Sequence, residues 1–189
     1  LLHLHVGPGE RRLSVLREVI DRFDVAPSTL YPTHVERSEE LMAEAIALAR
    51  RGMPIDLDVH EEDLPQWLRF HREHDGDPVL ITASSDAGLK SPHILFAQVM
   101  QCVRERIRPI GETLAIATAN PARILKLRGG ELAPGRRADV LLVDAGSLAI
   151  RHVVCNGRVV VRDGTVLLRE RFLEESNRTI HLIGKKAGS

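Results

Sequence analysis

The chain has 189 residues, of which 43% are hydrophobic and 28% charged, a composition typical of a globular domain and not of a low-complexity chain. Lys plus Arg and Asp plus Glu each number 26, so the formal charge cancels and predicts neither a nucleic-acid partner nor attraction to an anionic membrane. Only two cysteines, Cys102 and Cys155, are present, which excludes a disulfide framework and favours reduced thiols in a cytoplasmic protein.

The first residues already have the pattern of a buried strand. Leu1–Val6 is apolar apart from His3 and His5, is too short for the apolar region of a signal peptide, and follows no basic segment. Because the chain starts with leucine and inside a strand pattern, we expect further sequence before Leu1. Apolar runs elsewhere, such as Val153–Val161, are too short to span a bilayer.

Four strand candidates recur at a nearly constant interval, and helical patterns separate them. The strands are Leu1–Val6, Thr29–Val35, Met53–Val59 and Pro78–Ser85, and the helices between them are Glu10–Phe23, Ser38–Arg51 and Leu64–Glu73. Gly52 follows the second helix where a C-cap belongs. This alternation predicts βαβ units and a parallel sheet, which a barrel or an open doubly wound sheet would both fit.

The remainder of the chain changes character after about residue 130. Helices are predicted at Pro92–Arg106 and Gly111–Leu127, and the second is expected to restart with Asn120 as N-cap because a proline follows it. Beyond a turn-rich linker at 129–135, Asn156-Gly157 between two β-branched runs predicts a type I′ hairpin. We therefore expect an α/β domain over 1–130, then a β-rich segment with a polar tail over 131–189.

Three side chains that can bind metal follow separate predicted strands. His5 and His34 stand at the C-terminal ends of the first and second strands, and Asp86 directly follows the fourth. Catalytic groups gather at this edge of parallel sheets, and two imidazoles with a carboxylate are ligands that Zn²⁺ takes in hydrolytic sites. The pattern alone leaves a metal site and ordinary structural histidines both open.

Other polar residues are assigned structural roles at this point. His3 is expected to be a buried, hydrogen-bonded histidine, and the cluster from Asp58 to Asp63 is expected to favour a helix start through the helix dipole. His71 and His74 are expected on the surface. Arg37 offers a planar fork for a substrate carboxylate, although a solvated charge at a helix start fits the pattern equally.

Several segments resemble one known family. His5-Val6-Gly7, the Pro-Thr-His-Val-Glu-Arg segment at 32–37 and Ser84-Ser85-Asp86 resemble the last four barrel strands of isoaspartyl dipeptidases, which are amidohydrolases. Thr-Ala-Asn-Pro-Ala at 118–122, residues 130–140 and Asn156-Gly157-Arg158 resemble the C-terminal run of the amidohydrolase superfamily. The resemblance covers nearly the whole chain.

This resemblance implies that residues 1–130 are the C-terminal half of a (β/α)₈ barrel, with about four βα units, and that 131–189 contribute to a composite β-sandwich. It implies a binuclear centre of divalent metal, zinc, at which a metal-bound hydroxide attacks the amide carbonyl of a beta-aspartyl (isoaspartyl) dipeptide. By the same resemblance, His5 and His34 bind the second metal, and Asp86 touches the first metal and moves protons. Arg37 and Ser91 match positions that bind substrate.

The chain also departs from the family pattern. The His-x-His pair of barrel strand one and the lysine that bridges the metals have no counterpart, so the metal site is incomplete here and enzymatic activity is expected only of an intact parent. Lys90 stands near the place of the family's serine, with Ser91 one residue later, and Glu36 replaces a usual asparagine. These two changes leave the substrate open.

Two other functions compete with the dipeptidase. The first is an amidohydrolase that acts on another cyclic or N-acyl amide. The second is a non-catalytic half-barrel that pairs with another chain or with itself. For the dipeptidase, the expected partner is a small peptide substrate, without nucleic acid or membrane, and the intact parent is a candidate homo-oligomer.

Overall fold

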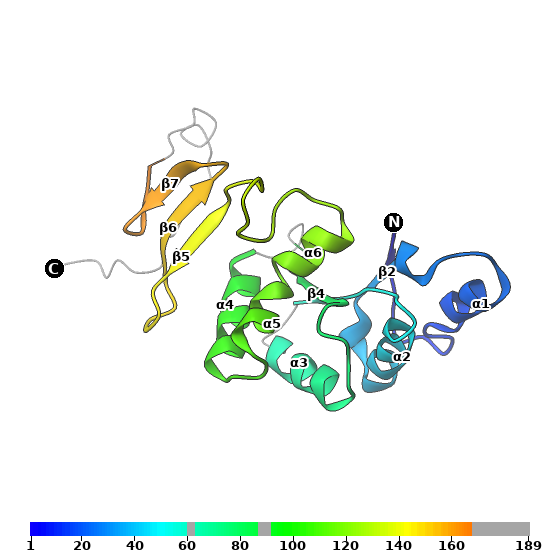
Figure 1. The fold of residues 1–189 in the computed structure, drawn as a ribbon. Helices are drawn as coiled ribbons and strands as arrows, with labels where there is room; N and C mark the ends of the chain where they lie inside the picture. Colours follow the sequence, from blue (N-terminus) through cyan, green and yellow to red (C-terminus); the bar gives the residue numbers. More distant parts are fainter. Residues whose placement is uncertain (60–62, 87–91, 168–189) are drawn as a thin grey trace, which may run out of the picture. The chain divides into compact units, whose positions relative to one another are not determined.

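The computed structural model describes residues 1–59, 63–86 and 92–167. The chain divides into two compact units (Figure 1), of which the first is Leu1–Gly130 and the second begins at Glu131. Helices and strands alternate in the first unit, whereas the regular elements of the second unit, as far as residue 167, are strands.

The first unit contains four short strands, each followed by helix. Its elements are β1 (Leu2–His5), α1 (Ser14–Arg22), η1 (Pro27–Thr29), β2 (Leu30–Thr33), η2 (Val35–Arg37), α2 (Glu39–Ala49), β3 (Ile55–Asp58), α3 (Leu64–Glu73), β4 (Ile81–Ser84), α4 (Pro92–Arg104), α5 (Ile110–Ala115) and α6 (Ala119–Ile124). Every predicted strand and helix of residues 1–130 is present, with ends trimmed by a few residues. The prediction of four βα units is therefore confirmed.

The strands pair in parallel, as the alternation requires. His5 of β1 is in register with Thr33 of β2, and Asp58 of β3 is in register with Ser84 of β4. Between described residues, the strand ladders form two pairs and none joins β2 to β3, although these two strands are neighbours. Pro32, in the middle of β2, contributes to this break because proline has no N–H to donate.

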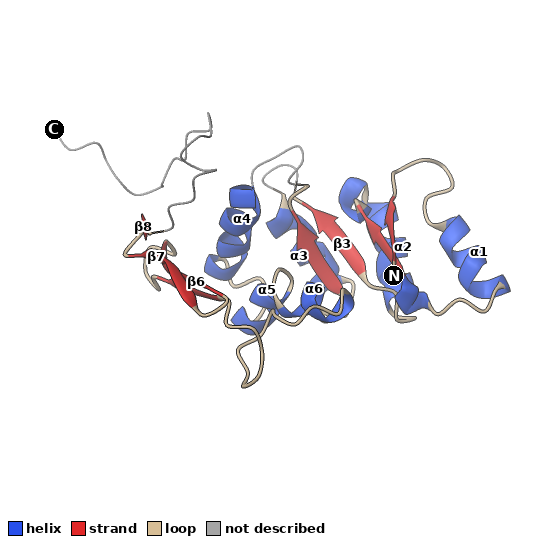
Figure 2. Ribbon diagram, turned by 90° about the horizontal axis from the view of Figure 1, so that it is seen from above, coloured by secondary structure: helices blue, strands red, loops and turns tan. Residues whose placement is uncertain are grey.

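Helix α2 shows why the sequence folds in this way. Ser38 is its N-cap, and the hydroxyl oxygen accepts a hydrogen bond from the backbone N–H of Leu41 at 3.2 Å. Gly52, just beyond the helix, has φ +96, a conformation that glycine adopts without strain. Figure 2 shows the helices of the first unit beside its strand pairs. The largest fully buried side chains between them include Leu41, Met42, Ile46, Met53, Ile55, Leu57, Leu64, Leu68 and Ile81.

The restart of helix near Asn120 occurs, but the capping prediction is wrong. Helix α6 takes Thr118 as N-cap, so Asn120 lies inside the helix. The buried Asn120 amide instead donates hydrogen bonds to the carbonyl oxygens of Pro78 and Ile81, each at 2.8 Å. The side chain thereby ties α6 to the chain entering β4, because tertiary acceptors were available that the local sequence did not reveal.

The second unit is an antiparallel sheet in the order β5-β6-β7-β8. Its strands are β5 (Val140–Val143), β6 (Ile150–Cys155), β7 (Arg158–Arg162) and β8 (Thr165–Val166). Asn156 and Gly157 join β6 to β7 with φ values of 48 and 78, as a type I′ turn requires. The predicted hairpin is confirmed.

Two general features complete the fold. Cys102 and Cys155 are free thiols, the first buried and the second exposed. Burial raises the pKa of the Cys102 thiol to about 12, and nearby Glu105 adds to the rise.

Among the described helices, none combines the length and the apolar character needed to cross a bilayer.

Candidate metal centre

The C-terminal ends of the parallel strands carry the candidate site. His5 is the last residue of β1, His34 directly follows β2, and Asp58 is the last residue of β3. Asp86 lies two residues beyond the end of β4. Because the strands run parallel, all four residues belong to one edge of the unit, as expected for a barrel active site.

His5 and His34 face each other directly. The Nδ1 atom of His5 lies 2.8 Å from Nε2 of His34, and their ring centroids are 4.8 Å apart. His5 is exposed, whereas the residue His34 is only 7% exposed. The structure therefore brings these two predicted metal ligands together.

A divalent metal fits this pair of nitrogens. Two imidazole ligands at about 2.0–2.1 Å from a tetrahedral Zn²⁺ stand about 3.3 Å apart, so the His5 and His34 nitrogens would need to separate by only about 0.5 Å. Both rings direct a nitrogen at the same place, which is the donor chemistry that zinc takes in hydrolytic sites. Their metal-binding role stays a prediction that this geometry allows.

Two of the predicted ligands have strained backbone. His34 has φ 66 and ψ 30, in the left-handed region, and Asp86 has φ 42. Non-glycine residues rarely adopt this conformation, which costs about 1–3 kcal/mol and concentrates at functional sites. At His34 the left-handed residue joins the end of β2 to the start of η2.

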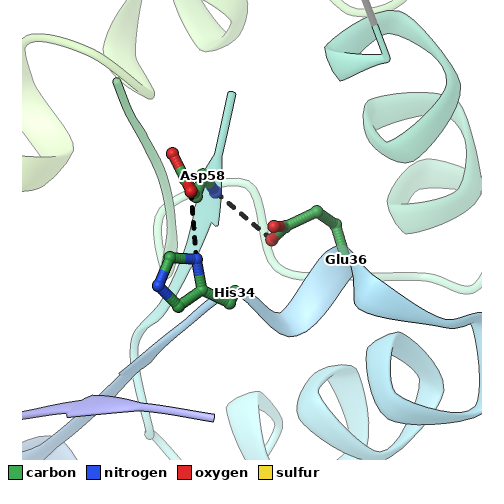
Figure 3. A group of neighbouring side chains, drawn as sticks. All are labelled: His34, Glu36 and Asp58. Atoms are coloured by element: carbon green, nitrogen blue, oxygen red, sulfur yellow. Dashed lines mark hydrogen bonds and ion pairs between the residues drawn. The ribbon is translucent and has the colours of Figure 1, made fainter. Parts of the chain in front are cut away.

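A buried acidic pair borders His34 on its other side (Figure 3). An Asp58 carboxyl oxygen lies 3.0 Å from Nδ1 of His34, and the Glu36 carboxyl accepts a hydrogen bond from the backbone N–H of Asp58 at 3.2 Å. Asp58 is 1% exposed and Glu36 is 7% exposed. Ligand atoms of His34, Glu36 and Asp58 lie within 4.8 Å of one another.

The sequence analysis missed this pair. Asp58 was expected to favour a helix start, and that prediction is wrong because Asp58 ends β3 and is buried against His34. Asp63 occupies the N-cap position of α3, and residues 60–62 of the same predicted cluster lie outside the described residues. The available signal was the spacing of Asp56 and Asp58, because residues two apart on a strand face the same side.

Burial controls the proton affinities in this cluster. Burial lowers the pKa of His34, the charge of Asp58 opposes that shift, and Arg37, His5 and Asp86 also act on this imidazole. Burial raises the pKa of Glu36 to about 7. The charge of Asp86 raises the pKa of His34, and the metal-binding role of Asp86 stays a prediction.

Of the two residues that were predicted to bind substrate, the structure describes only Arg37. The Arg37 side chain is exposed in η2, and its terminal nitrogen lies 3.5 Å from Nδ1 of His34, so a guanidinium stands beside the histidine pair. Ser91 lies outside the described residues, as does Lys90. Arg37 therefore lies beside the histidine pair, and the substrate-binding roles of Arg37 and Ser91 both stay predictions.

Two predictions about other histidines are wrong. His3 is exposed and stacks on the ring of Tyr31, the residue in register with it on β2, with centroids 5.0 Å apart. His71 is 0% exposed, and Nδ1 lies 3.0 Å from the Arg108 guanidinium. Helix α3 turns His71 inward against the segment that follows α4. His74 is exposed, as predicted.

A second buried carboxyl group lies on β3, farther from the strand end than Asp58. Asp56, two residues before Asp58 on β3, accepts hydrogen bonds from the hydroxyls of Thr33 at 2.7 Å, Thr82 at 2.5 Å and Ser84 at 2.6 Å. These hydroxyls come from β2 and β4, so Asp56 joins the two strand pairs that backbone hydrogen bonds leave separate. Tyr31 adds a longer contact of 3.3 Å to the same carboxyl.

The comparison with known proteins gives a match to a family model and short matches to adenine deaminases. The sequence profile of the amidohydrolase family matches residues 65–160, just over half of the chain. Adenine deaminase 2 from Jannaschia sp. (strain CCS1) is 46% identical over 57 residues, which is 29% of this chain and 9% of that protein.

Similar solved structures cover far more of the chain. The beta-aspartyl dipeptidase from Fervidobacterium islandicum AW-1 is 30% identical, with a TM-score of 0.83 over 90% of this chain, and its complex with a beta-Asp-Leu dipeptide gives 0.79 over 88%. The chain spans 48% of that protein. The atrazine chlorohydrolase from Arthrobacter aurescens TC1, complexed with zinc, is 18% identical with a TM-score of 0.59, over 92% of this chain and 46% of that one. The predicted half of a (β/α)₈ barrel, most like an isoaspartyl dipeptidase, is thereby confirmed as the fold.

Proposed function

Because the chain belongs to the amidohydrolase family, we propose that the complete barrel to which its four βα units correspond is a metal-dependent hydrolase of isoaspartyl dipeptides. The observation that carries the proposal is the exposed Arg37 guanidinium beside the converging His5 and His34 imidazoles. In the proposal, Arg37 is the anchor for a substrate carboxylate beside the candidate metal centre. The 30% identity to a beta-aspartyl dipeptidase over 88–90% of the chain supports the same substrate class.

In this proposal His5, His34 and Asp86 hold metal, and zinc suits their imidazole and carboxylate donors. The bound metal would supply a nucleophile at neutral pH and polarise the amide carbonyl. Asp86 takes the proton of the attacking water and gives it to the leaving amine. Arg37 binds a substrate carboxylate through its planar fork, which fixes the side-chain amide against the metal centre.

Adenine is the competing substrate, because the Jannaschia relative is an adenine deaminase. That match covers 29% of the chain, whereas the dipeptidase match covers 88–90%. Adenine also carries no carboxylate for Arg37 to bind. Both observations favour the dipeptide, and an N-acyl or cyclic amide with a carboxylate remains the nearest alternative within the family.

The test is an assay of the protein encoded by the full open reading frame that contains this chain. With zinc present, we expect release of aspartate from beta-Asp-Leu, no deamination of adenine, and loss of activity after chelation. Deamination of adenine, or activity that survives a chelator, would overturn the proposal.

The 189-residue chain by itself provides a control. It offers His5, His34 and Asp86 without the strand-one His-x-His pair and bridging lysine of the family, so we expect weak zinc binding and no turnover. Zinc-dependent cleavage of beta-Asp-Leu by the purified 189-residue chain would contradict the assignment of an incomplete site.

A further inference from the structure

We propose that Asp58 is a positioning residue that holds His34 in the tautomer with the proton on Nδ1, so that the Nε2 lone pair faces His5. The inference rests on the proposed function only where it assigns metal binding to His34. The tautomer itself is a property of this chain and can be measured without metal.

The contact that carries the inference is short and buried. The Asp58 carboxyl oxygen lies 3.0 Å from Nδ1 of His34, and the two side chains are 1% and 9% exposed. The geometry is that of an ion pair and not of an aligned hydrogen bond, so the contact acts through charge. An ionised carboxyl oxygen attracts a proton on Nδ1 and repels a lone pair there, so the contact favours the tautomer with the proton on Nδ1. Nε2 then keeps its lone pair, and Nε2 is the atom that lies 2.8 Å from His5.

Asp58 is itself held in place by Glu36. The backbone N–H of Asp58 donates to the Glu36 carboxyl at 3.2 Å, and Glu36 lies only two residues after His34 (Figure 3). The end of β3 is therefore fastened to the turn that carries the imidazole. A carboxylate that orients a metal-binding histidine through its second nitrogen typically improves metal affinity by about 10- to 100-fold.

One contact competes with this assignment. A terminal nitrogen of Arg37 lies 3.5 Å from the same Nδ1 and could donate to it only if Nδ1 carried a lone pair. That distance is at the outer limit of a hydrogen bond, and it is longer than the 3.0 Å between Nδ1 and the charged Asp58 carboxyl oxygen. The Asp58 contact therefore decides the tautomer, and the Arg37 guanidinium interacts through its charge.

The same three residues could also be considered as a cation cage, since their ligand atoms lie within 4.8 Å. A cation there would bind Nδ1 of His34 and would have to displace the 3.0 Å contact to Asp58. It would also leave Nε2 protonated and directed at His5. The observed contacts favour Asp58 and Glu36 as supports for a site on the Nε2 side.

Nitrogen-15 NMR of the imidazole rings of the 189-residue chain tests the tautomer directly. Long-range proton–nitrogen correlations distinguish a protonated ring nitrogen from one with a lone pair, and a His34→Gln variant assigns the signals. At about pH 8, above the ordinary histidine pKa of about 6.5, we expect wild-type His34 to show a protonated Nδ1 and an unprotonated Nε2. An unprotonated Nδ1 in the wild-type chain would overturn the proposal, and no variant is needed for that outcome.

Two aspartates on one strand provide a matched pair of variants. Asp58→Asn is expected to give His34 signals of both tautomers, because an amide can either accept from Nδ1 or donate to it. Asp56→Asn changes an equally buried carboxyl group of β3 that contacts hydroxyls, and it should leave the His34 signals unchanged. An unchanged tautomer in Asp58→Asn, or an equal change in both variants, would contradict a specific role for Asp58.

Zinc affinity, measured by competition with a chromophoric chelator, separates this inference from the proposed function. We expect Asp58→Asn to weaken zinc binding by about 10- to 100-fold relative to Asp56→Asn. If the tautomer is as stated but zinc does not bind even to the protein of the full reading frame, the proposed function fails and the positioning role of Asp58 stands. If zinc binds and both variants bind it with equal affinity, the positioning role is overturned.

Discussion

Asp56 and Asp58 lie two residues apart on β3, are both 1% exposed, and bind different kinds of partner. Asp56 accepts hydrogen bonds from hydroxyls of the neighbouring strands, and Asp58 contacts the His34 imidazole. Because residues two apart on a strand face the same side, β3 carries a structural carboxyl and, one layer nearer the strand ends, a carboxyl that belongs to the candidate site.

Removing one hydroxyl from Asp56 should destabilise the first unit. Thr33→Val keeps the shape of the side chain but deletes the donor 2.7 Å from the Asp56 carboxyl. We expect a loss of about 1–3 kcal/mol in the free energy of unfolding, measured by urea denaturation. Thr165→Val, on the exposed strand β8, is the control and should change stability by no more than about 0.5 kcal/mol. Equal stability of the two variants would refute the role of this hydrogen bond.

Gly76 is required by its approach to His71. A Cβ added at Gly76 would lie 2.3 Å from atoms of the buried imidazole, which cannot move freely because Arg108 contacts Nδ1. We expect Gly76→Ala to cost about 1–3 kcal/mol and to lower the Tm in a thermal melt. Gly111→Ala is the matched control, because Gly111 lies in α5 with nothing within 4 Å of the added carbon. The Gly111→Ala substitution should be neutral or should stabilise the protein by up to about 1 kcal/mol. If Gly76→Ala has the Tm of the wild type, the contact with His71 relaxes without a loss of stability.

His71 should make the stability depend on pH below neutrality. Burial lowers the pKa of His71 to about 3, and Arg108 adds to the shift. In the unfolded chain this pKa returns to about 6.5, so the unfolded state binds the additional proton between the two values.

The stability that depends on neutral His71 is therefore complete above about pH 6.5 and is lost as the pH falls towards 3, at up to about 1.4 kcal/mol per unit. Urea denaturation of wild type and His71→Gln at several pH values measures the effect as a difference in slope. Parallel pH curves for the two proteins would rule it out.

Arg37 should determine substrate binding more than turnover. In the active protein of the full reading frame, we expect Arg37→Ala to raise KM for beta-Asp-Leu by about 10- to 100-fold, because one charge-assisted contact is lost. Arg37→Lys should restore only part of this loss, since lysine lacks the planar fork. Arg104→Ala, exposed at the end of α4, is the control. A fall in kcat with an unchanged KM would argue against a carboxylate anchor.

The predictions that succeeded depend on local pattern. The four strands, the helices between them and the Asn156-Gly157 turn follow from periodicity and turn chemistry, which act within a few residues. Those that failed concern single polar side chains. Asn120 was expected as a cap and His71 on the surface, yet both are buried because segments distant in sequence supply their partners.

The sequence by itself determined which residues stand at the strand ends, because the alternation of strand and helix places His5, His34 and Asp86 there whatever the packing. Only the tertiary structure decided that His34 lies between His5 on one side and the buried Asp58 on the other. The physical reason is that a strand end is fixed by local periodicity. The partner of each imidazole nitrogen depends instead on which strands become neighbours and on how the left-handed turn at His34 aims the ring.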